Sequence, residues 1–210
     1  MIKKVELGGY VGYSAILFAN AMRKAGGETY ICLERNPEFA AVVSSLVNLA
    51  GLSSVVRVEV GSAGDSIRRL HSSSSLRTID LLFLDHYKPA YLPDLKLCEE
   101  LGLIRPGSVL AADNVVKPGN PPYLEYVRSS VEEKKAKAQG LGGGKVDVSE
   151  AFESRYSKQY EKREGVEVLD AGGRGNPALV YKSELVKSFE PTGVPVSESC
   201  TSFITMHGAY

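Results

Sequence analysis

Two short apolar runs of the sequence each end in side chains that could bind a cation. Asp85 follows the run over residues 82–84, and Asp113 and Asn114 follow the run over residues 110–112. If the runs are neighbouring strands of a parallel sheet, these three side chains meet at its carboxyl edge. Two carboxylates and an amide oxygen suit a hard cation such as Mg²⁺, with water and substrate completing its octahedron. Two unrelated strand-end caps are the alternative.

A glycine-rich turn, E-L-G-G-Y-V-G-Y-S over residues 6–14, follows the first apolar run. Glycines let a ligand approach the backbone, and the helix that begins there supplies free N–H groups. The spacing is not G-x-G-x-x-G, and Glu6 would repel a pyrophosphate, so the turn does not match the dinucleotide fingerprint. A carboxylate suits a cationic ligand, such as the amino group and sulfonium of S-adenosylmethionine. An ordinary glycine turn is the alternative.

An acidic residue, Glu34, ends the second apolar run. At this place a carboxylate can accept both ribose hydroxyls of an adenosine ligand, although it could also be a helix cap or a surface group. The segment G-S-A-G-D over residues 61–65, after the third run, would lie beside the adenine. This pattern favours a nucleoside ligand without distinguishing NAD from S-adenosylmethionine.

Two further polar residues stand next to the predicted cation site. Lys88 lies three residues past Asp85. A partly desolvated lysine beside a cation loses its proton more readily and could act as a general base, whereas a solvated surface lysine is the commoner case. His86 could be a ligand or a base. Because side chains alternate along a strand end, it points away from Asp85, which favours packing against a bound adenine.

Apolar periodicity predicts the elements that position these residues. Strand-like runs alternate with amphipathic stretches, which implies an α/β fold with a doubly wound parallel sheet. Pro37 and Gly51 bracket one helix as its first-turn proline and its C-terminal glycine. The predicted strands are residues 5–7, 29–33, 55–60, 79–84 and 108–112, and the predicted helices are residues 13–24, 37–50, 65–71 and 91–101, with another beginning at residue 123.

The character of the sequence changes after residue 130. Residues 131–163 are charged, polar and helix-prone, which suggests an insertion. The short apolar runs at residues 166–169 and 178–181 predict an antiparallel hairpin that closes the sheet. Residues 188–210 are rich in Pro, Ser, Thr and Gly without periodicity, and predict a disordered tail. We therefore expect one domain over residues 1–187.

Composition narrows the class of protein. The 210 residues contain 25 Lys+Arg and 25 Asp+Glu, so the formal net charge is zero. This balance argues against partners such as nucleic acid or a membrane surface, and no run has the roughly 18 apolar residues of a membrane helix. Cys32, Cys98 and Cys200 suit free thiols in a reducing compartment. With no signal-peptide pattern at the start, we expect a cytoplasmic protein.

Taken together, these segments resemble the catechol O-methyltransferase family. The matching segments, in the family's order between about residues 4 and 130, are E-L-G-G-Y-V-G-Y-S, L-E-R-N-P-E-F-A-A, F-L-D-H-Y-K, Y-L-P-D and L-A-A-D-N-V-V-K-P-G. The resemblance implies a Rossmann-like sheet of seven strands whose last strand is antiparallel. It also implies S-adenosylmethionine and Mg²⁺ as cofactors, and a small catechol as substrate.

The resemblance further implies a role for each residue of the site. Asp85, Asp113 and Asn114 would hold Mg²⁺, and Lys88 would deprotonate one hydroxyl of the catechol. The cofactor site would have three parts: the turn that holds the methionine end, the acidic residue that binds the ribose, and the residues around the adenine. Its residues would be Glu6, Gly8, Tyr10, Tyr13, Ser14, Glu34, Arg35, Gly61, Ser62, Ala63, Asp85, His86 and Tyr87.

The remaining implied contacts are to the catechol. Asn114 would contact the substrate as well as the metal, and Pro118 would form part of the wall around the aromatic ring. A late glutamate would hold the second hydroxyl; counting back from the hairpin indicates Glu164, with Glu161 or Glu167 as alternatives.

The sequence also departs from the family. The first predicted strand begins near Lys4, so we expect the helices that the family places before it to be missing. Tyr87 stands in place of a tryptophan, and Ala63-Gly64 in place of a polar pair near the adenine. One alternative is a truncated, catalytically impaired protein of this fold that binds the cofactor weakly or not at all. Another is a nicotinamide dehydrogenase, against which Glu6 and the glycine spacing argue. The oligomeric state is open.

Overall fold

The computed structural model of the chain describes residues 3–139, 173–189 and 195–208. Its strands are β1 Lys3–Leu7, β2 Thr29–Glu34, β3 Val56–Val60, β4 Leu81–Leu84, β5 Val109–Ala112, β6 Leu179–Phe189 and β7 Pro195–Gly208. Its helices are α1 Tyr13–Lys24, α2 Pro37–Leu49, α3 Ala63–Ser72, α4 Tyr91–Glu100, α5 Pro121–Arg128 and α6 Val131–Ala138, with short helical turns at η1 Lys88–Ala90 and η2 Val115–Gly119.

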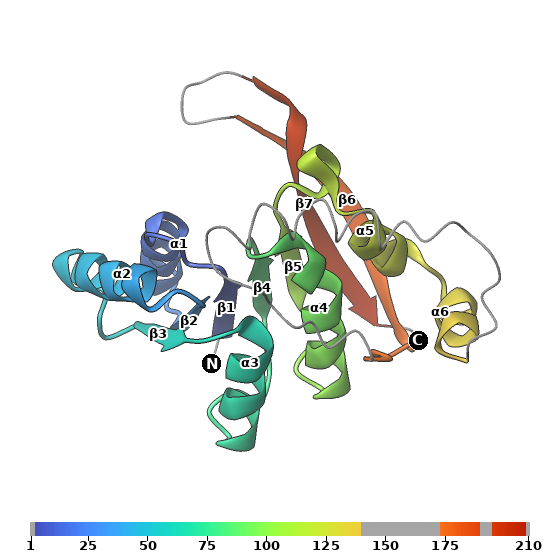
Figure 1. The fold of residues 1–210 in the computed structure, drawn as a ribbon, viewed down its shortest axis with the longest axis horizontal. Coiled ribbons are helices and arrows are strands. Elements are labelled where there is room, and N and C mark those ends of the chain that lie inside the picture. Colours follow the sequence, from blue (N-terminus) through green and yellow to red (C-terminus); the bar gives the residue numbers. More distant parts are fainter. Residues whose placement is uncertain (1–2, 140–172, 190–194, 209–210) are drawn as a thin grey trace.

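All of these strands join one sheet, in the order β3-β2-β1-β4-β5-β7-β6 (Figure 1). β1 to β5 pair in parallel, whereas β7 runs antiparallel to both of its neighbours, β5 and β6. The prediction of a Rossmann-like, doubly wound sheet of seven strands with an antiparallel last strand is therefore confirmed. In such a sheet, the ends of β1, β2, β4 and β5 face the same edge, where ligands usually bind.

Alternating side chains of the strands build one apolar core on each face of the sheet. On β2, Ile31 and Leu33 belong to the core covered by α3, α4 and α5, whereas Tyr30 and Cys32 belong to the core covered by α1 and α2 (Figure 1). Both faces of the central strands are buried, as is usual for parallel sheets flanked by helices. The loops that leave the carboxyl edge are thereby held on a rigid support.

Helix boundaries follow the capping signals in the sequence. Pro37 is the first residue of α2, and the side chain of Asn36 accepts hydrogen bonds from the backbone N–H of Glu38 (2.8 Å) and Phe39 (3.3 Å). α6 begins with a capping box between Ser130 and Glu133. These local devices explain why most predicted helices begin and end within a residue or two of the observed ones.

The C-terminal hairpin matches the prediction in one strand, since the run at residues 178–181 coincides with the start of β6, and differs from it in the other. The sequence predicts strands at residues 166–169 and 178–181 and a disordered tail from residue 188. The first of these runs lies outside the described residues. The observed hairpin is β6 with β7, and residues 195–208 are β-strand rather than disordered. β7 pairs with β6 over most of its length and with β5 at residues 202–205. A polar composition without local periodicity does not reveal this long-range pairing, which satisfies backbone groups of β7.

No helix in the described part of the chain is both long and apolar enough to span a membrane.

Candidate functional site at the carboxyl edge of the sheet

The two acidic strand ends lie side by side. Leu84 and Ala112 are partners in the β4–β5 ladder, so Asp85 and Asp113 follow at the same level, and the N–H of Asp113 donates to the carbonyl oxygen of Leu84 (3.0 Å). The adjacency on which the predicted cation site depends is thus present. Asn114 comes next, with a left-handed backbone (φ 55°) that redirects the chain into η2.

Lys88 connects the two strand ends. Its Nζ lies 3.2 Å from Oδ1 of Asp85 and 3.5 Å from the carbonyl oxygen of Asp113. It also donates to the hydroxyl of Tyr91 at 2.6 Å, and the residue is only 7% exposed. Lys88 is therefore held inside the edge of the sheet, which excludes the alternative of a solvated surface lysine.

The electrostatics of this edge favour a bound cation. The pKa of Asp85 is raised above its ordinary value, chiefly because burial penalises the charged carboxylate and also because Asp113 repels it, although attraction to Lys88 acts in the opposite direction. No group of three or more His, Cys, Asp or Glu side chains that could hold a metal occurs in the described residues. The predicted ligands are instead two carboxylates and the amide of Asn114, which are hard oxygen donors of the kind that Mg²⁺ prefers, and their binding of a metal stays a prediction.

The glycine turn after β1 passes directly against the Asp85 strand end. Gly8 has φ +91°, and a Cβ added to it would lie 2.6 Å from the carbonyl oxygen of Asp85. Its N–H donates to the carbonyl oxygen of Leu33 (2.9 Å). Only glycine fits this combination of backbone angle and close approach, so the turn is held between the ends of β2 and β4.

Glu34 has a structural role at the end of β2, and its contact with a ribose stays a prediction. Its Oε2 accepts hydrogen bonds from the backbone N–H of Gly9 (3.0 Å) and Tyr10 (2.7 Å), and its Oε1 accepts one from Asn36 (2.8 Å). The carboxylate therefore ties the glycine turn to the end of β2. Each carboxylate oxygen has two lone pairs, so these three hydrogen bonds leave one further acceptor site, on Oε1.

Glu6 lies beneath the turn rather than at the open edge. Its side chain is fully buried, and its Oε1 accepts a hydrogen bond from the hydroxyl of Ser14, which is half-buried in the first turn of α1. Burial raises the pKa of Glu6 to about 7, against the opposing effect of the Ser14 hydrogen bond. Glu6 is therefore connected to the first turn of α1 through Ser14.

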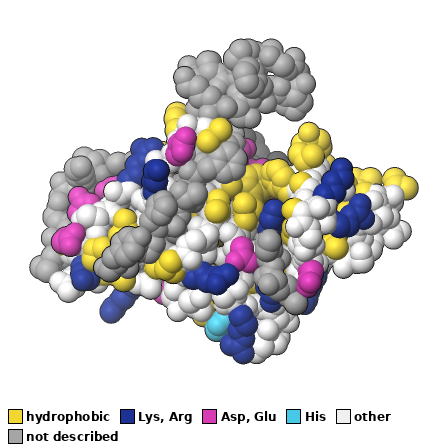
Figure 2. All heavy atoms as spheres, turned by 180° about the vertical axis from the view of Figure 1, so that it is seen from behind, with side chains coloured by type: hydrophobic (Ala, Val, Ile, Leu, Met, Phe, Trp, Pro, Cys, Tyr) yellow, Lys and Arg dark blue, Asp and Glu magenta, His cyan; other side chains and the backbone are white. Residues whose placement is uncertain are grey.

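The other predicted cofactor residues are divided between the surface and the end of β2. Tyr10 and Tyr13 are 57% and 73% exposed, and the ring of Tyr10 packs edge-on against Phe39 with centroids 4.9 Å apart. Figure 2 shows that hydrophobic side chains remain exposed on the face of the molecule opposite the view of Figure 1. Arg35 follows Glu34 and is half-buried. The segment formed by Gly61, Ser62 and Ala63 lies beside Glu34, because the N–H of Gly61 donates to the carbonyl oxygen of Glu34 (3.1 Å).

His86 packs against protein groups. Its Nε2 lies 3.0 Å from Oδ2 of Asp94, and its ring stacks on Tyr91 with centroids 4.9 Å apart and an angle of 14° between the planes. Tyr87 is also buried. Both residues lie at the predicted edge, and their contact with an adenine remains a prediction.

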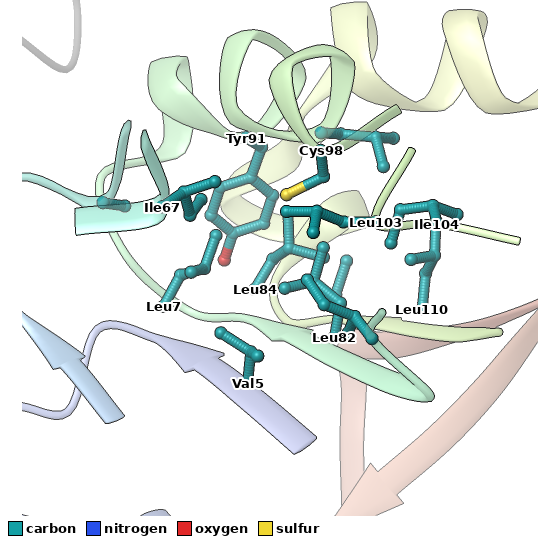
Figure 3. Close-up of a cluster of buried hydrophobic side chains, with 14 of the residues drawn as sticks. Val5, Leu7, Ile67, Leu82, Leu84, Tyr91, Cys98, Leu103, Ile104 and Leu110 are labelled. Carbon is teal, nitrogen blue, oxygen red and sulfur yellow. The ribbon is translucent and has the colours of Figure 1, made fainter. Parts of the chain in front are cut away.

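Sequence reasoning gave no role to three residues that organise the site: Tyr91, Asp94 and Asn120. The ring of Tyr91 reaches from α4 to the sheet, with its hydroxyl oxygen near Leu7 and Leu84 (Figure 3). Asn120 donates from Nδ2 to the carbonyl oxygen of Lys88 (2.8 Å). Tyr91 and Asp94 belong to the segment Y-L-P-D, and its match to the family was the sequence feature that could have identified them. Their contacts, however, depend on how α4 packs against the sheet.

Two predicted substrate contacts are not tested. Pro118 belongs to the η2 turn, and its side chain is not described. Glu164 and its alternatives Glu161 and Glu167 lie outside the described residues.

Comparisons with known proteins point to one family. Residues 5–115 match the model of a methyltransferase domain family. The chain is 45% identical over 126 residues to catechol O-methyltransferase of Bos taurus, covering 60% of this chain and 46% of that protein. It is 37% identical over 174 residues to catechol O-methyltransferase of Sus scrofa, covering 83% and 84%. The chain thus spans about half the length of the first of these relatives.

A solved structure with a similar fold is also that of an O-methyltransferase. The structure of the O-methyltransferase TomG from Streptomyces achromogenes, in complex with S-adenosylmethionine, superposes with a TM-score of 0.59 at 21% identity, covering 98% of this chain and 73% of that one. This likeness shows the fold, and the sequence matches supply the family. The sequence matches argue against the alternative that the protein is a nicotinamide dehydrogenase. The chain therefore belongs to the methyltransferase family that includes the catechol O-methyltransferases.

Proposed function

We propose that this protein is an S-adenosylmethionine-dependent O-methyltransferase that methylates one hydroxyl of a catechol chelated by Mg²⁺. The observation that carries the proposal is the placement of Lys88 between the strand ends of Asp85 and Asp113, next to the turn at Gly8. A methyl donor above the turn and a hydroxyl beside Lys88 would be neighbours. The names of the bovine and porcine relatives support the catechol as substrate.

In this proposal the glycine turn and the end of β2 bind the cofactor. Ser14 and the N–H groups in the first turn of α1 face the amino-acid end, since the first turn of a helix has no intrahelical partners for its N–H groups. Glu34 would accept from a ribose hydroxyl at the remaining acceptor site of Oε1 while it holds the turn in place. His86, backed by Tyr91 and Asp94, lies beside the adenine.

The β4 and β5 ends would bind the catechol. Asp85, Asp113 and Asn114 would hold Mg²⁺, which when bound supplies a Lewis acid that lowers the pKa of a chelated hydroxyl. Lys88, between the two strand ends, is placed to receive the hydroxyl proton. S-adenosylmethionine would supply the methyl group: the oxygen would bond to the methyl carbon as the bond from that carbon to the sulfonium sulfur breaks, leaving S-adenosylhomocysteine and a methyl ether. Fixing the two reactants at adjacent strand ends supplies much of the rate advantage.

The buried free thiols of Cys32 and Cys98 support the cytoplasmic location that the sequence suggests.

The test is release of S-adenosylhomocysteine from S-adenosylmethionine in the presence of Mg²⁺ and a panel of catechols. We expect turnover with vicinal diols, little with monophenols of similar size, and loss of turnover when EDTA removes the metal. Lys88→Ala and Asp113→Ala should abolish turnover, whereas Lys137→Ala, which changes an exposed lysine paired with Glu125, should not.

Calorimetry with S-adenosylhomocysteine separates binding from catalysis. If the wild-type protein binds this product but no catechol yields turnover, the catalytic proposal is wrong and the impaired-enzyme alternative stands. If monophenols react as well as catechols and EDTA has no effect, the chelation step is wrong.

A further inference from the structure

The loop after β4 and the loop after β5 carry the groups that the proposed reaction uses. Lys88 begins η1 after β4, and Asn114 immediately precedes η2 after β5. The contacts described above hold the amine of Lys88 to the strand ends at Asp85 and Asp113, before η2 begins. A contact made by Asn120 connects Lys88 to the far end of η2.

Asn120 uses both ends of its side-chain amide. Its Nδ2 donates to the carbonyl oxygen of Lys88 (2.8 Å), and its Oδ1 accepts from the backbone N–H of Tyr123 (3.4 Å), which caps the start of α5. The residue is only 1% exposed. Because the bond to Lys88 is buried, water does not compete for either group, and the low local dielectric strengthens it.

The backbone of Asn120 closes the η2 turn. Its N–H donates to the carbonyl oxygen of Val115 (2.9 Å), and the N–H of Gly119 donates to that of Asn114 (3.1 Å). Both bonds span five residues, which is the pattern of a single π-helical turn, and such turns are frequent at functional sites. Asn120 thus ends η2, begins α5 and holds the backbone at Lys88.

Capping alone does not explain an asparagine at this position. Serine, aspartate and asparagine cap helices about equally well, because each supplies an oxygen that accepts from the first turn. Only the amide of asparagine combines that acceptor with N–H donors on a separate atom. The carbonyl oxygen of Lys88 already accepts from the N–H of Tyr91, so it would not be left unsatisfied without Asn120. The bond from Asn120 therefore adds a restraint between the two loops.

The start of α5 is itself held in place. The ring of Tyr123 is fully buried and packs edge-on against the ring of Tyr91, with centroids 5.8 Å apart and planes at 85°. The hydroxyl of Tyr91 in turn bonds to Nζ of Lys88 (2.6 Å). Lys88 is thereby connected to the junction of η2 and α5 at its carbonyl, through Asn120, and at its amine, through Tyr91.

The position of η2 relative to Lys88 bears on which hydroxyl of a catechol reacts. In the proposed site, the hydroxyl beside Lys88 would lose its proton and be methylated, while Asn114 and the η2 turn, which carries Pro118, would contact the rest of the substrate. An unsymmetrical catechol has two orientations in such a site, and each places a different hydroxyl beside Lys88. The preference between the two orientations depends on how η2 meets the ring substituent.

We propose that Asn120 is a positioning residue, which fixes η2 relative to Lys88 and thereby selects the hydroxyl of an unsymmetrical catechol that is methylated. This inference rests on the proposed function, because it takes a catechol as substrate. It deepens that function by naming a residue that orients the substrate without touching the reacting atoms.

The experiment compares the wild-type chain with Asn120→Ser and Asn120→Asp, using S-adenosylmethionine, Mg²⁺ and 3,4-dihydroxybenzoate. Both substitutions keep a cap for α5 and remove the amide donor, and the serine hydroxyl is too short to reach the carbonyl oxygen of Lys88. Liquid chromatography measures the ratio of the two monomethyl ethers, and initial rates give kcat and the KM for the catechol.

We expect the wild type to favour one ether. Because small displacements of a bound reactant are costly, each variant should change the product ratio by about threefold or more and raise the KM for the catechol. The Kd for S-adenosylhomocysteine, measured by calorimetry, should be unchanged, since the side-chain hydrogen bonds of Asn120 go to Lys88 and Tyr123, neither of which is a predicted cofactor residue.

A second cap provides the control. Ser130→Ala removes the side-chain cap of α6, a helix that carries no predicted residue of the site, and should keep the wild-type product ratio and KM. Urea denaturation of all three variants measures their stability. A loss of stability lowers the amount of active protein and therefore the apparent kcat, but it does not change the ratio of the two products.

The contrary outcomes are distinct. If both Asn120 variants keep the wild-type ratio and KM, or if the wild type forms both ethers equally, the inference is wrong while the proposed function stands. If only one of the two variants changes the ratio, the introduced side chain rather than the lost bond is responsible, and the inference is again wrong. If the wild type yields no methyl ether from any catechol, the proposed function fails and the inference falls with it.

Discussion

The Nζ of Lys88 lies 2.6 Å from the hydroxyl oxygen of Tyr91, and the same hydroxyl donates to the carbonyl oxygen of Asp113 (3.3 Å). Tyr91 thus supports the lysine from α4 while it contacts the strand end that carries the second carboxylate. A long side chain such as lysine has many rotamers, and this contact restricts it to one position at the carboxyl edge of the sheet.

Tyr91→Phe should weaken both stability and catalysis. The ring packing is retained, but Lys88 and the Asp113 carbonyl each lose a buried partner, so we expect the free energy of unfolding to fall by about 1–3 kcal/mol. A less firmly positioned Lys88 should lower the methyl-transfer rate by about tenfold. Tyr123→Phe is the matched control, since the buried hydroxyl of Tyr123 has no partner among the described residues. Urea denaturation measures the stability of each variant, and initial rates measure its catalysis. Equal losses in Tyr91→Phe and Tyr123→Phe would contradict the role given to Tyr91.

Gly8→Ala should damage the site more than the same change at another left-handed glycine. A Cβ at Gly8 would lie 2.6 Å from the carbonyl oxygen of Asp85, whereas a Cβ at Gly51 (φ +66°) would meet nothing within 4 Å. Gly51→Ala should cost only the backbone strain, about 1–2 kcal/mol. Gly8→Ala should cost more and should reduce binding of S-adenosylhomocysteine, as thermal unfolding and calorimetry can measure. Equal effects would show that the close approach to Asp85 is relaxed in solution.

Glu6→Gln should change how stability depends on pH. The folded pKa of Glu6, about 7, is above the ordinary value of 4.5, so the folded state binds more protons between these values. Its contribution to stability is therefore present at low pH and is lost as pH rises from about 4.5 to 7, by about 3 kcal/mol in total. The variant lacks this loss, so its stability relative to wild type should increase from pH 4.5 to pH 8. Parallel curves in urea denaturation across this range would refute a raised pKa.

Tyr181→Phe should loosen the attachment of the C-terminal hairpin. The carboxylate of Glu99, 2% exposed, accepts hydrogen bonds from the hydroxyls of Tyr126 and Tyr181 and from the N–H of Asn176 (2.7 Å). Removing the donor on β6 leaves a buried carboxylate less satisfied, and we expect a loss of about 1–3 kcal/mol.

A surface variant provides the comparison for Tyr181→Phe. The pair of Lys137 and Glu125 has side chains 48% and 59% exposed, so Lys137→Ala should cost less than about 1 kcal/mol. Chemical denaturation measures the free energy of unfolding of both variants. If Lys137→Ala were the more harmful change, the Glu99 network would not be what secures β6.

The local features of this fold could be predicted from the sequence because short-range interactions cause them. Residues 13–24 are α1 as predicted, and α2 begins at Pro37 and ends one residue before the predicted end. Buried parallel strands appear as apolar runs, and the residues that follow those runs are the polar residues of the edge. The amino-acid sequence by itself was therefore enough to select Asp85, Lys88 and Asp113 as candidate residues.

Which of these residues meet, and through what partners, depends on the tertiary structure. The position of β4 beside β5 brings Asp85 and Asp113 together, and the packing of α4 places Tyr91 against Lys88. The pairing of β7 with β5 joins segments that are far apart in the sequence, from Val109–Ala112 to the strand Pro195–Gly208. No short-range pattern encodes such contacts, because they depend on the burial and hydrogen bonding that distant segments supply only after folding.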